Sequence, residues 1–380
     1  MKPKLIRVTT ADISLAGLLK GQLRFLNGEF EVVGLAADTG VLASVGEREG
    51  IRMINVPMHR EISIWNDLDC LFMLIRLFRK EKPFIVHSNT PKGSLLSMMA
   101  ALVSRVPHRI YTVTGLRYQG ASGLSRWVLK TMERITCLCA NKVIPEGQGV
   151  KNTLLTDHIT RKSLAVIHNG NINGIDTSFF SVEASPESRS SMRNKLGLGD
   201  SDFAFIFIGR IVRDKGMNEL ADAMRNLSIS HPECKLILVG SFESELDPLL
   251  PGNEDFYKSS PNVVFVGRQQ DVRPYLAAAD ALVFPSYREG FPNVVMQAGA
   301  MGLPSIVTDI NGCNEIIVDK VNGRIIPSKD EPGLESMMEW FMDNREEVEK
   351  MASGSACMIK ERYEQKDVWD AIMKMYLSLD

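Results

Sequence analysis

The sequence has no apolar run as long as the roughly eighteen residues that a membrane-spanning helix needs. Its six cysteines have neither the spacing of zinc ligands nor that of a disulfide framework. The first eight residues carry basic side chains, but they lack the apolar core and the cleavage site of a signal peptide. Glycine and proline, at 29 and 17 of 380 residues, are too few for a collagenous or disordered chain. These absences argue against integral-membrane, secreted and fibrous proteins and predict a cytoplasmic location.

What is present is an ordinary globular composition, with 44% apolar and 24% charged residues, and the length predicts two or three domains. The net charge of −2 hides an asymmetry. Residues 1–180 hold 23 Lys and Arg against 14 Asp and Glu, a balance of +9, and the remainder holds 21 against 32, a balance of −11. A basic half predicts contact with an anionic surface, although an uneven spread of solvated charge explains the asymmetry equally well.

Short runs of apolar, β-forming residues alternate with helical patterns along the chain, as in buried parallel strands of βαβ units. Two series of runs predict an α/β fold with two Rossmann-like, doubly wound parallel sheets that face a cleft. We expect a first domain at 1–180, a linker at Ser181–Ser191, a second domain at 181–365, and a C-terminal helix at about 366–380 that packs back on the first domain. The predicted strands are Leu5–Thr9, Glu31–Leu35, Arg52–Val56, Phe84–His87, Arg109–Val113, Lys142–Ile144 and Leu164–Ile167 in the first series, and Ala204–Ile208, Lys235–Val239, Asn262–Val266, Ala281–Phe284, Ser305–Val307 and Arg324–Ile326 in the second.

Ligands of such sheets bind outside the carboxyl ends of the strands, so the residues that follow each run are the candidates. Gly209 follows the run at Ala204–Ile208 and allows a tight turn. Arg210 and Lys215 come next, just before a helix that begins near Met217. Two cations beside the N–H groups of a helix start suit a diphosphate, and a basic surface turn is the alternative.

A second loop follows the run at Ala281–Phe284. It contains Glu289, which can accept hydrogen bonds from sugar hydroxyls, and Gly290, which permits close approach of a ligand to the backbone. Pro292 suits the first position of the helix that follows. A surface ion pair between Glu289 and Arg288 is the alternative.

Together, Gly209–Gly216 and Tyr287–Pro304 closely resemble glycosyltransferase family 4, a family of retaining enzymes with the GT-B fold. The resemblance covers nearly the whole chain. Segments of the first half occupy places typical of bacterial capsule and O-antigen members; they are Val86–Lys92, Ile110–Leu116, Val166–Gly170 and Asn173–Asp176.

The resemblance implies a role for each loop. Arg210 and Lys215 would bind the nucleotide diphosphate and stabilise the charge that develops on it, and Glu289 would contact the donor sugar. The implied donor site is completed by Gly209, Gly290, Phe291 and Gln297.

Gln297 departs from the family pattern, because the family has a second glutamate there that binds ribose hydroxyls. An amide can still accept from one hydroxyl and donate to another. Gly290 and Phe291 would offer backbone N–H groups to the sugar or phosphate.

The first half is expected to bind the acceptor. The strand Leu5–Thr9 leads to Ser14, whose hydroxyl suits a phosphate or acceptor, or equally a helix N-cap. His87 follows its own strand and is a cleft candidate, with a structural histidine as the alternative. Thr114 stands where many family members have a histidine, so the role of that histidine does not carry over.

Three stretches of the first half combine Lys and Arg with Leu, Phe or Trp: Leu15–Leu26, Trp65–Lys82 and Tyr118–Ile135. Most of their apolar faces are expected to be core stripes. The same composition is what an interfacial helix presents to anionic lipid. Together with the resemblance, it predicts peripheral attachment to the inner face of the cell membrane.

The sequence therefore predicts a retaining hexosyltransferase that moves a hexosyl unit from a UDP-sugar to a lipid-linked saccharide, in capsule or O-antigen synthesis. No clustered set of His, Asp and Glu indicates a metal site, so neither a metal nor another cofactor is expected, and no nucleic-acid partner either. Two alternatives stay open. A GT-B sugar-nucleotide epimerase would convert the donor without an acceptor, and a non-catalytic sugar-nucleotide-binding protein would bind UDP without turnover.

Overall fold

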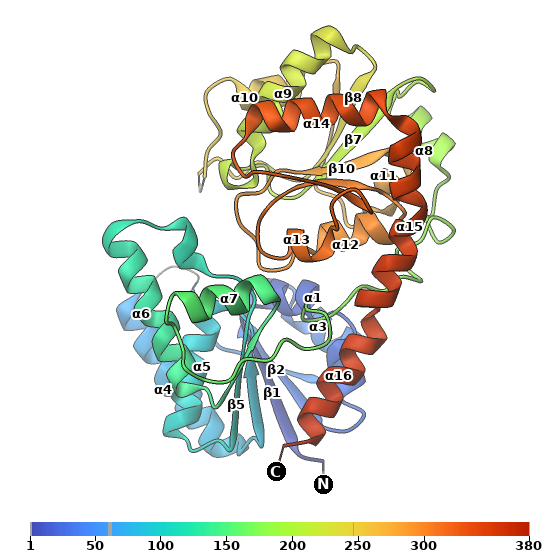
Figure 1. Ribbon diagram of the computed structural model, residues 1–380. Helices are drawn as coiled ribbons and strands as arrows, with labels where there is room; N and C mark the ends of the chain where they lie inside the picture. Colours follow the sequence, from blue (N-terminus) through green and yellow to red (C-terminus); the bar gives the residue numbers. More distant parts are fainter. Residues whose placement is uncertain (1, 60–62, 246, 380) are drawn as a thin grey trace. The chain divides into compact units, whose positions relative to one another are not determined.

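The computed structural model describes residues 2–59, 63–245 and 247–379, which form two compact units (Figure 1). The first unit comprises the chain up to Gly174 together with the C-terminal segment from Gln365, and the second comprises Ile175–Glu364. The division therefore falls after Gly174 instead of 180. Its physical reason is that Ile175 donates its backbone N–H to the carbonyl oxygen of Tyr363 at 2.8 Å, within the second unit.

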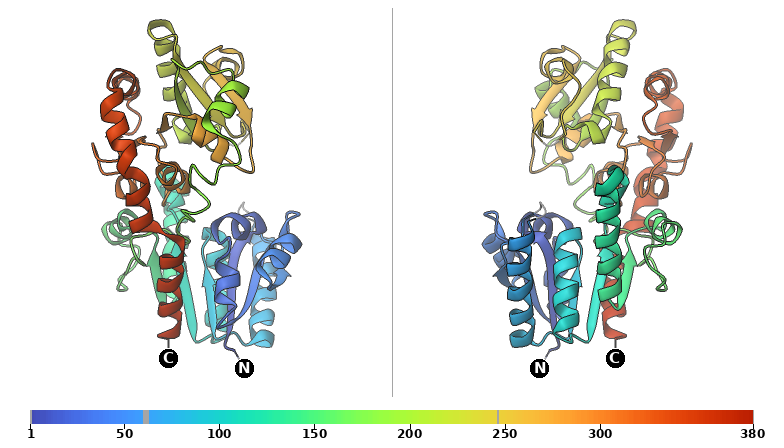
Figure 2. Two further views of the ribbon diagram at one scale, coloured as in Figure 1. Left: turned by 90° about the vertical axis from the view of Figure 1, so that its right-hand side faces the viewer. Right: turned by 90° about the vertical axis from the view of Figure 1, so that its left-hand side faces the viewer.

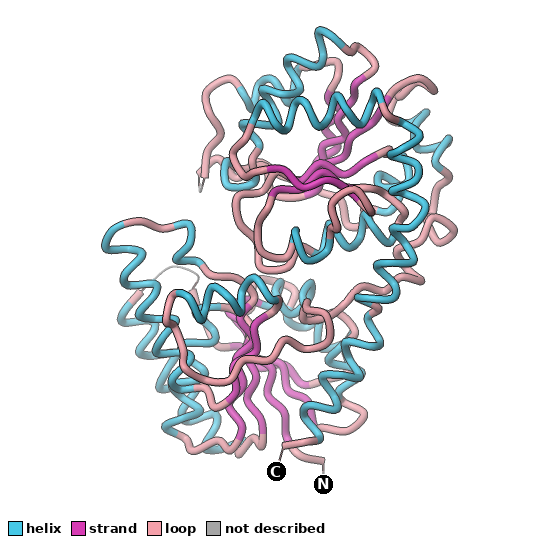
Figure 3. The backbone as a smooth tube through the Cα atoms, in the orientation of Figure 1, coloured by secondary structure: helices cyan, strands magenta, loops and turns pink. Residues whose placement is uncertain are grey.

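The first unit is a sheet of six parallel strands in the order β3-β2-β1-β4-β5-β6, between two layers of helices (Figures 2 and 3). Its strands are β1 (Lys4–Ala11), β2 (Glu31–Ala37), β3 (Arg52–Asn55), β4 (Ile85–Ser88), β5 (His108–Val113) and β6 (Lys142–Pro145). Its helices are α1 (Asp12–Leu18), α2 (Gln22–Leu26), α3 (Leu42–Glu49), α4 (Ile64–Glu81), α5 (Pro91–Val103), the 3₁₀ turn η1 (Arg117–Gly120), α6 (Gly123–Cys139), α7 (Gln148–Thr156) and α16 (Gln365–Leu377).

Alternation along β1 divides the core of this unit between the two faces of the sheet. Ile6 and Val8 pack with side chains of α4, α5 and α6. Leu5 packs on the other face with α1, α2 and α16, from which Ile372 and Tyr376 are buried. The C-terminal helix thus completes the core of the first unit, and its red ribbon lies beside the blue strands in Figure 1.

The sequence predicts one amphipathic stretch at Leu15–Leu26, but the structure divides it into α1 and α2. Gly21 lies between them with a φ of +81°, in the left-handed region. A Cβ there would lie 2.7 Å from the ring of Trp369, so the glycine also lets α16 approach this turn.

The predicted strand Leu164–Ile167 is wrong. Leu164 is buried with the α4–α6 layer, whereas Ile167 packs on the opposite face of the sheet. The segment therefore crosses from one face to the other instead of pairing with β6. Lys162 holds its start in place by donating to the carbonyl oxygens of Cys137 and Ala140, at the end of α6.

The second unit repeats this architecture with the order β12-β11-β10-β7-β8-β9, again all parallel. The predicted pair of doubly wound parallel sheets is therefore confirmed. Its strands are β7 (Phe203–Ile208), β8 (Cys234–Val239), β9 (Val263–Gly267), β10 (Ala281–Phe284), β11 (Ser305–Thr308) and β12 (Gly323–Ile326). Its helices are α8 (Arg189–Lys195), the 3₁₀ turn η2 (Arg213–Lys215), α9 (Met217–Ser230), α10 (Asn253–Ser259), α11 (Arg273–Ala278), α12 (Asn293–Ala300), α13 (Cys313–Ile316), α14 (Glu331–Asp343) and α15 (Arg345–Tyr363).

The predicted linker Ser181–Ser191 is partly helical, because α8 begins inside it at Arg189. The hydroxyl of Ser188 accepts a hydrogen bond from the backbone N–H of Ser191 at 3.3 Å and so caps the helix. Serine is common both in linkers and at helix N-caps, so the serine content of this segment did not distinguish a linker from the start of a helix.

Candidate active site

Each sheet reverses its strand order at one point, where ligands of doubly wound folds bind. In the second unit this point lies between β7 and β10, which pair directly while β8 and β11 continue outward on opposite sides. The two loops singled out in the sequence leave these two strands. The site is therefore positioned by the topology of the sheet.

The loop after β7 carries the two predicted cations. Arg210 is 49% exposed and pairs with Glu243 at 3.0 Å, whereas Lys215 ends η2 just before α9. Gly216 follows with a φ of +72°, and a Cβ there would lie only 2.1 Å from the carbonyl oxygen of Pro285. The glycine therefore lets the loop after β7 touch the loop after β10.

The loop after β10 brings Glu289 to Lys215. The ammonium of Lys215 is ion-paired with the carboxylate of Glu289, and their side chains are only 16% and 17% exposed. Ser286 donates its hydroxyl to the same carboxylate oxygen, Oε1, at 2.9 Å. The alternative pairing of Glu289 with Arg288 is wrong, because Arg288 binds Asp214 at 2.6 Å.

The remaining predicted donor residues surround this pair. Gly290 and Phe291 are buried just before α12, and the Phe291 ring meets Tyr363 edge-on at 5.5 Å between centroids. Gln297 is half-buried on α12, and its side chain makes no hydrogen bond with the residues that the structure describes. The N–H of Gly209 is already donated to Val239 at 3.0 Å.

At the switch point of the first unit, one threonine lies near the end of β1 and another follows β4. Thr10 donates its backbone N–H to the hydroxyl oxygen of Thr90 at 2.7 Å, and its own hydroxyl oxygen accepts from Gly93 at 3.0 Å. A Cβ at Gly93 would lie 2.9 Å from the Thr10 nitrogen, so α5 begins directly against the end of β1. This edge presents hydroxyl groups in place of a glycine-rich loop.

Ser14 does not cap a helix, because α1 begins at Asp12 and Ser14 lies inside it, half-buried. The group that organises this turn is Asp12. Burial alone would raise the pKa of Asp12, but hydrogen bonds from Thr39, Val41 and Ile13 hold it below its ordinary value. A carboxylate directly after a strand was the signal for it in the sequence.

His87 is buried at the end of β4, and both of its ring nitrogens are engaged within the first unit. Its ring nitrogens are hydrogen-bonded to the hydroxyls of Tyr376 and of Thr112, the latter at 2.7 Å. Burial, and then the charge of Arg7, lowers the pKa of His87 well below its ordinary value, so the ring is neutral. Thr114 donates its hydroxyl to the carbonyl oxygen of Asn89 at 2.8 Å, which ties β5 to the end of β4.

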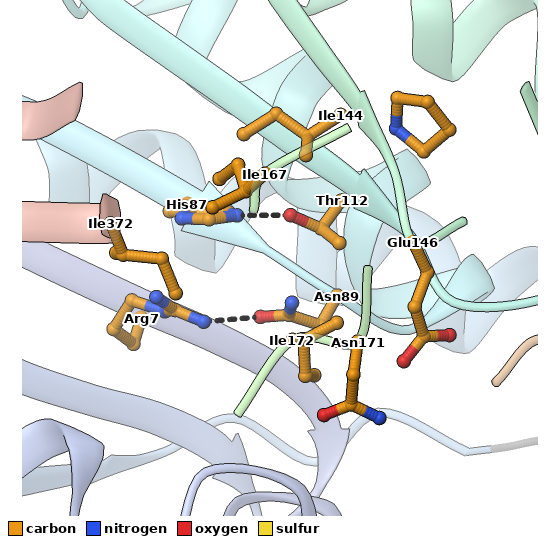
Figure 4. Close-up of a pocket in the computed structure, with 11 residues that line it drawn as sticks. Arg7, His87, Asn89, Thr112, Ile144, Glu146, Ile167, Asn171, Ile172 and Ile372 are labelled. Atoms are coloured by element: carbon orange, nitrogen blue, oxygen red, sulfur yellow. Dashed lines mark hydrogen bonds between the residues drawn. The ribbon is translucent and has the colours of Figure 1, made fainter. Parts of the chain in front are cut away.

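His87, Thr112 and Asn89 line a small cavity of about 10 Å³ in the first unit, together with Arg7 (Figure 4). Arg7, buried in the middle of β1, donates to Asn89 at 2.8 Å, to Tyr376 at 2.7 Å and to Gln22 at 3.1 Å. The signal for this network in the sequence is a charged residue inside an otherwise apolar strand. That signal was not used in the sequence analysis. It holds α16 against the sheet.

Among the residues that the structure describes, no three His, Cys, Asp or Glu side chains gather as a metal site would require. Two Asp-x-Asp triplets occur in the sequence, at 67–69 and 200–202. Asp67 is paired with Lys92 at 2.6 Å, and the second triplet precedes β7. Neither triplet belongs to the loops that carry Lys215 and Glu289. Over the same described residues, no helix is long and apolar enough to cross a bilayer.

Comparisons with known proteins match both halves of the chain. A family model described as Glycosyltransferase Family 4 matches residues 19–178, and one described as Glycosyl transferases group 1 matches residues 188–356. The chain is 29% identical, over 98% of its length and 96% of the relative's, to the capsular polysaccharide biosynthesis glycosyltransferase CapM of Staphylococcus aureus. It is 27% identical, over 87% of both chains, to the UDP-Gal:alpha-D-GlcNAc-diphosphoundecaprenol alpha-1,3-galactosyltransferase of Escherichia coli.

Solved structures agree on the fold. Anabaena HepE in complex with UDP and glucose superposes with a TM-score of 0.80 at 19% identity, over 99% of this chain and 100% of that one. WaaG, a glycosyltransferase involved in lipopolysaccharide biosynthesis, superposes with a TM-score of 0.75 at 15% identity, over 99% and 100%. The two sheets, each with its switch point, define a protein of the GT-B class. More specifically, the chain carries a Glycosyltransferase Family 4 domain in its first half and a Glycosyl transferases group 1 domain in its second, and it is a glycosyltransferase enzyme.

Proposed function

We propose that this glycosyltransferase moves a hexosyl unit from a UDP-sugar to a hydroxyl of a lipid-linked saccharide, with retention of configuration, in the synthesis of a bacterial surface polysaccharide. The observation that carries the proposal is the contact of Lys215 with Glu289 at the switch point of β7 and β10. Lys215 would then bind a diphosphate and Glu289 sugar hydroxyls, and the contact supports the proposal because the two groups lie side by side. The activities of two relatives, capsule synthesis and transfer to a diphosphoundecaprenol saccharide, support the acceptor class.

The chemistry follows from this arrangement. Lys215, Arg210 and the start of α12 would stabilise the negative charge that grows on the leaving diphosphate. Charges fixed by the protein then do what a divalent ion does in other transferases, so the reaction would need no metal. Glu289 would orient the sugar through its hydroxyls. The leaving diphosphate itself would take the acceptor proton, on the face from which it departs.

Peripheral attachment to the inner face of the cell membrane is part of the proposal. On α4 and α6, which both pack on α5, large apolar side chains stand in solvent: Trp65 is 81% and Trp127 is 62% exposed. Exposed basic side chains accompany them on the same helices, at Arg76, Arg79, Lys80 and Arg126. Exposed tryptophan beside Lys and Arg is the composition of a surface that enters the headgroup region of anionic lipid.

The deciding experiment offers the purified protein a panel of radiolabelled UDP-sugars, with membrane extracts of a capsulated bacterium as the source of acceptors. Label transferred to lipid from one donor is the expected result. Conversion of the free donor without acceptor would indicate an epimerase instead, and UDP binding without any turnover would indicate a non-catalytic protein. Transfer from a donor with another nucleotide, and from no UDP-sugar, would refute the donor assignment.

A further inference from the structure

Three consecutive residues of the loop after β10 each contact a different residue of the loop after β7 or the helix that follows it. Tyr287 donates its hydroxyl to Oε1 of Glu219 at 2.5 Å, and Arg288 is ion-paired with Asp214 at 2.6 Å. The third contact is the pair of Glu289 with Lys215. Glu219 lies in the first turn of α9, directly behind the predicted diphosphate loop.

The three contacts differ in what a donor does to them. A diphosphate that binds Lys215 would compete with Glu289 for the same ammonium and would weaken the central pair. The contact of Tyr287 with Glu219 involves neither group, so weakening of the central pair does not itself break that contact. A backbone hydrogen bond from Tyr287 to the carbonyl oxygen of Asp214, 3.0 Å long, supports it.

We propose that Tyr287 is a positioning residue, which clamps the loop after β10 to the start of α9 so that Lys215 and Glu289 keep their places when the donor separates them. This inference rests on the proposed function, because it assumes that Lys215 and Glu289 meet a sugar nucleotide. The clamp acts through these two residues and touches no substrate itself.

The surroundings of Tyr287 suit a fixed hydroxyl. Burial, and then its hydrogen bond to Glu219, raises the pKa of Tyr287, so the phenol stays protonated and remains a donor. The ammonium of Lys329 lies 4.8 Å from the centre of its ring, which fixes the ring from another side.

The chain offers a matched control in Tyr257. Its hydroxyl also binds the first turn of α9, at the carbonyl oxygen of Met217 and 2.6 Å away, but it comes from α10 and not from a donor loop. Removing either hydroxyl takes one hydrogen bond from the same helix start. Only Tyr287→Phe removes a contact of the loop that carries Glu289.

The test combines kcat with thermal stability for the two phenylalanine variants. We expect Tyr287→Phe to lower kcat about tenfold, equivalent to about 1.4 kcal/mol, with little change in Tm. Tyr257→Phe should leave kcat within about twofold and lower Tm by roughly 2–4 °C, since its hydroxyl is wholly buried. A kcat of Tyr287→Phe within about twofold of the native value would overturn the proposal.

A double-mutant cycle then tests whether the partner is Glu219. The double variant Tyr287→Phe with Glu219→Ala should be no slower than Glu219→Ala alone, because both changes remove the same contact. Losses that multiply would show that the two residues act separately and would reject the clamp.

Amide hydrogen exchange separates failure of the clamp from failure of the proposed function. Tyr287→Phe should speed exchange at residues 213–216, where Tyr257→Phe should not, and this measurement needs no turnover. If the native protein transfers no sugar but this difference is found, the proposed function fails and the clamp stands. Equal exchange in both variants rejects the clamp whatever the activity.

Discussion

The ammonium of Lys215 and the carboxylate of Glu289 form an ion pair that is shielded from solvent on most of its surface. They come from two loops that lie 74 residues apart in the sequence and meet because β7 and β10 are neighbours. Each group satisfies the other in this structure. Under the proposed function, a ligand with both a phosphate and sugar hydroxyls would replace the pairing, and the pair would select for a ligand that carries both functions.

Removal of the cations should abolish most turnover. Loss of one group that stabilises developing charge costs about 2.7–4 kcal/mol, or on the order of a hundredfold to a thousandfold in rate, and we expect this for Lys215→Ala and Arg210→Ala. UDP binding should weaken as well, by calorimetry. Arg213→Ala, in the same loop but paired with Asp247, is the control. Turnover of the first two variants within about threefold of native, only ~0.6 kcal/mol, would remove the diphosphate assignment.

Charge should matter at Glu289 and not at Gln297. Hydrogen bonds to a charged group contribute roughly 1.5–3 kcal/mol against about 1 for neutral pairs, so Glu289→Gln should slow turnover by an order of magnitude or more. Gln297→Glu should stay active, whereas Gln297→Leu should weaken UDP binding by leaving ribose hydroxyls unpaired. If the leucine variant binds UDP as tightly as the native protein, Gln297 is not at the ribose.

Transfer should survive excess EDTA, because protein cations take the place of a divalent ion at the diphosphate. The measurement is the initial rate after dialysis against EDTA, with and without added magnesium or manganese. Loss of activity that either ion restores would contradict this expectation.

Binding to anionic liposomes should succeed at low salt and fail near 1 M, where the Debye length shrinks to about 3 Å. Replacing Trp65 and Trp127 by serine should weaken flotation further. Ile229→Ser is the control, because this side chain is 84% exposed but lies on the acidic second unit. Equal binding to neutral and anionic vesicles would show that the basic charge of the first half does not attach the protein to anionic lipid.

The stability of the protein should fall as the pH rises toward neutrality, because burial raises the pKa of Glu133 from 4.5 to about 7. The folded state then binds a proton that the unfolded chain releases above pH 4.5, and this advantage is lost as the pH passes 7. The loss is about 3 kcal/mol in all, of which about 2 kcal/mol falls between pH 5.5 and 8. Denaturant unfolding at pH 5.5 and 8 should show the difference in the native protein and not in Glu133→Gln. Glu81→Gln is the control: Arg52 and Lys4 lower the pKa of Glu81 to about 2, so its effect should be the same at both pH values. A native stability equal at the two pH values would contradict the shift.

The sequence was informative where local pattern determines structure. Runs of apolar β-forming residues predict the positions of all twelve strands of the two sheets. The rule that ligands bind at the carboxyl ends of strands points to Lys215 and Glu289, which the structure brings into contact. The run at Leu164–Ile167 failed because a short apolar segment looks the same whether it pairs with a strand or crosses an edge.

Contacts between distant segments were beyond the reach of such patterns. Arg7 and Tyr376 lie 369 residues apart, and neither suggests the other. The same holds for Tyr287 and Glu219, since nothing in either neighbourhood fixes how the two loops face each other. The prediction for Ser14 failed for a local reason, because the helix begins three residues earlier than a serine cap would place it.

Because α16 packs on the first unit, it determines the order in which the two units of a newly made chain can complete their cores. Synthesis of the first unit starts with β1, yet its core lacks Ile372 and Tyr376 until α16 has left the ribosome. Until then Arg7 and His87 have no phenol to bind. The second unit, whose residues are contiguous, can close its own core earlier. The unit that is synthesised first therefore completes its core last, and a chain that terminates before α16 leaves the core of the first unit incomplete.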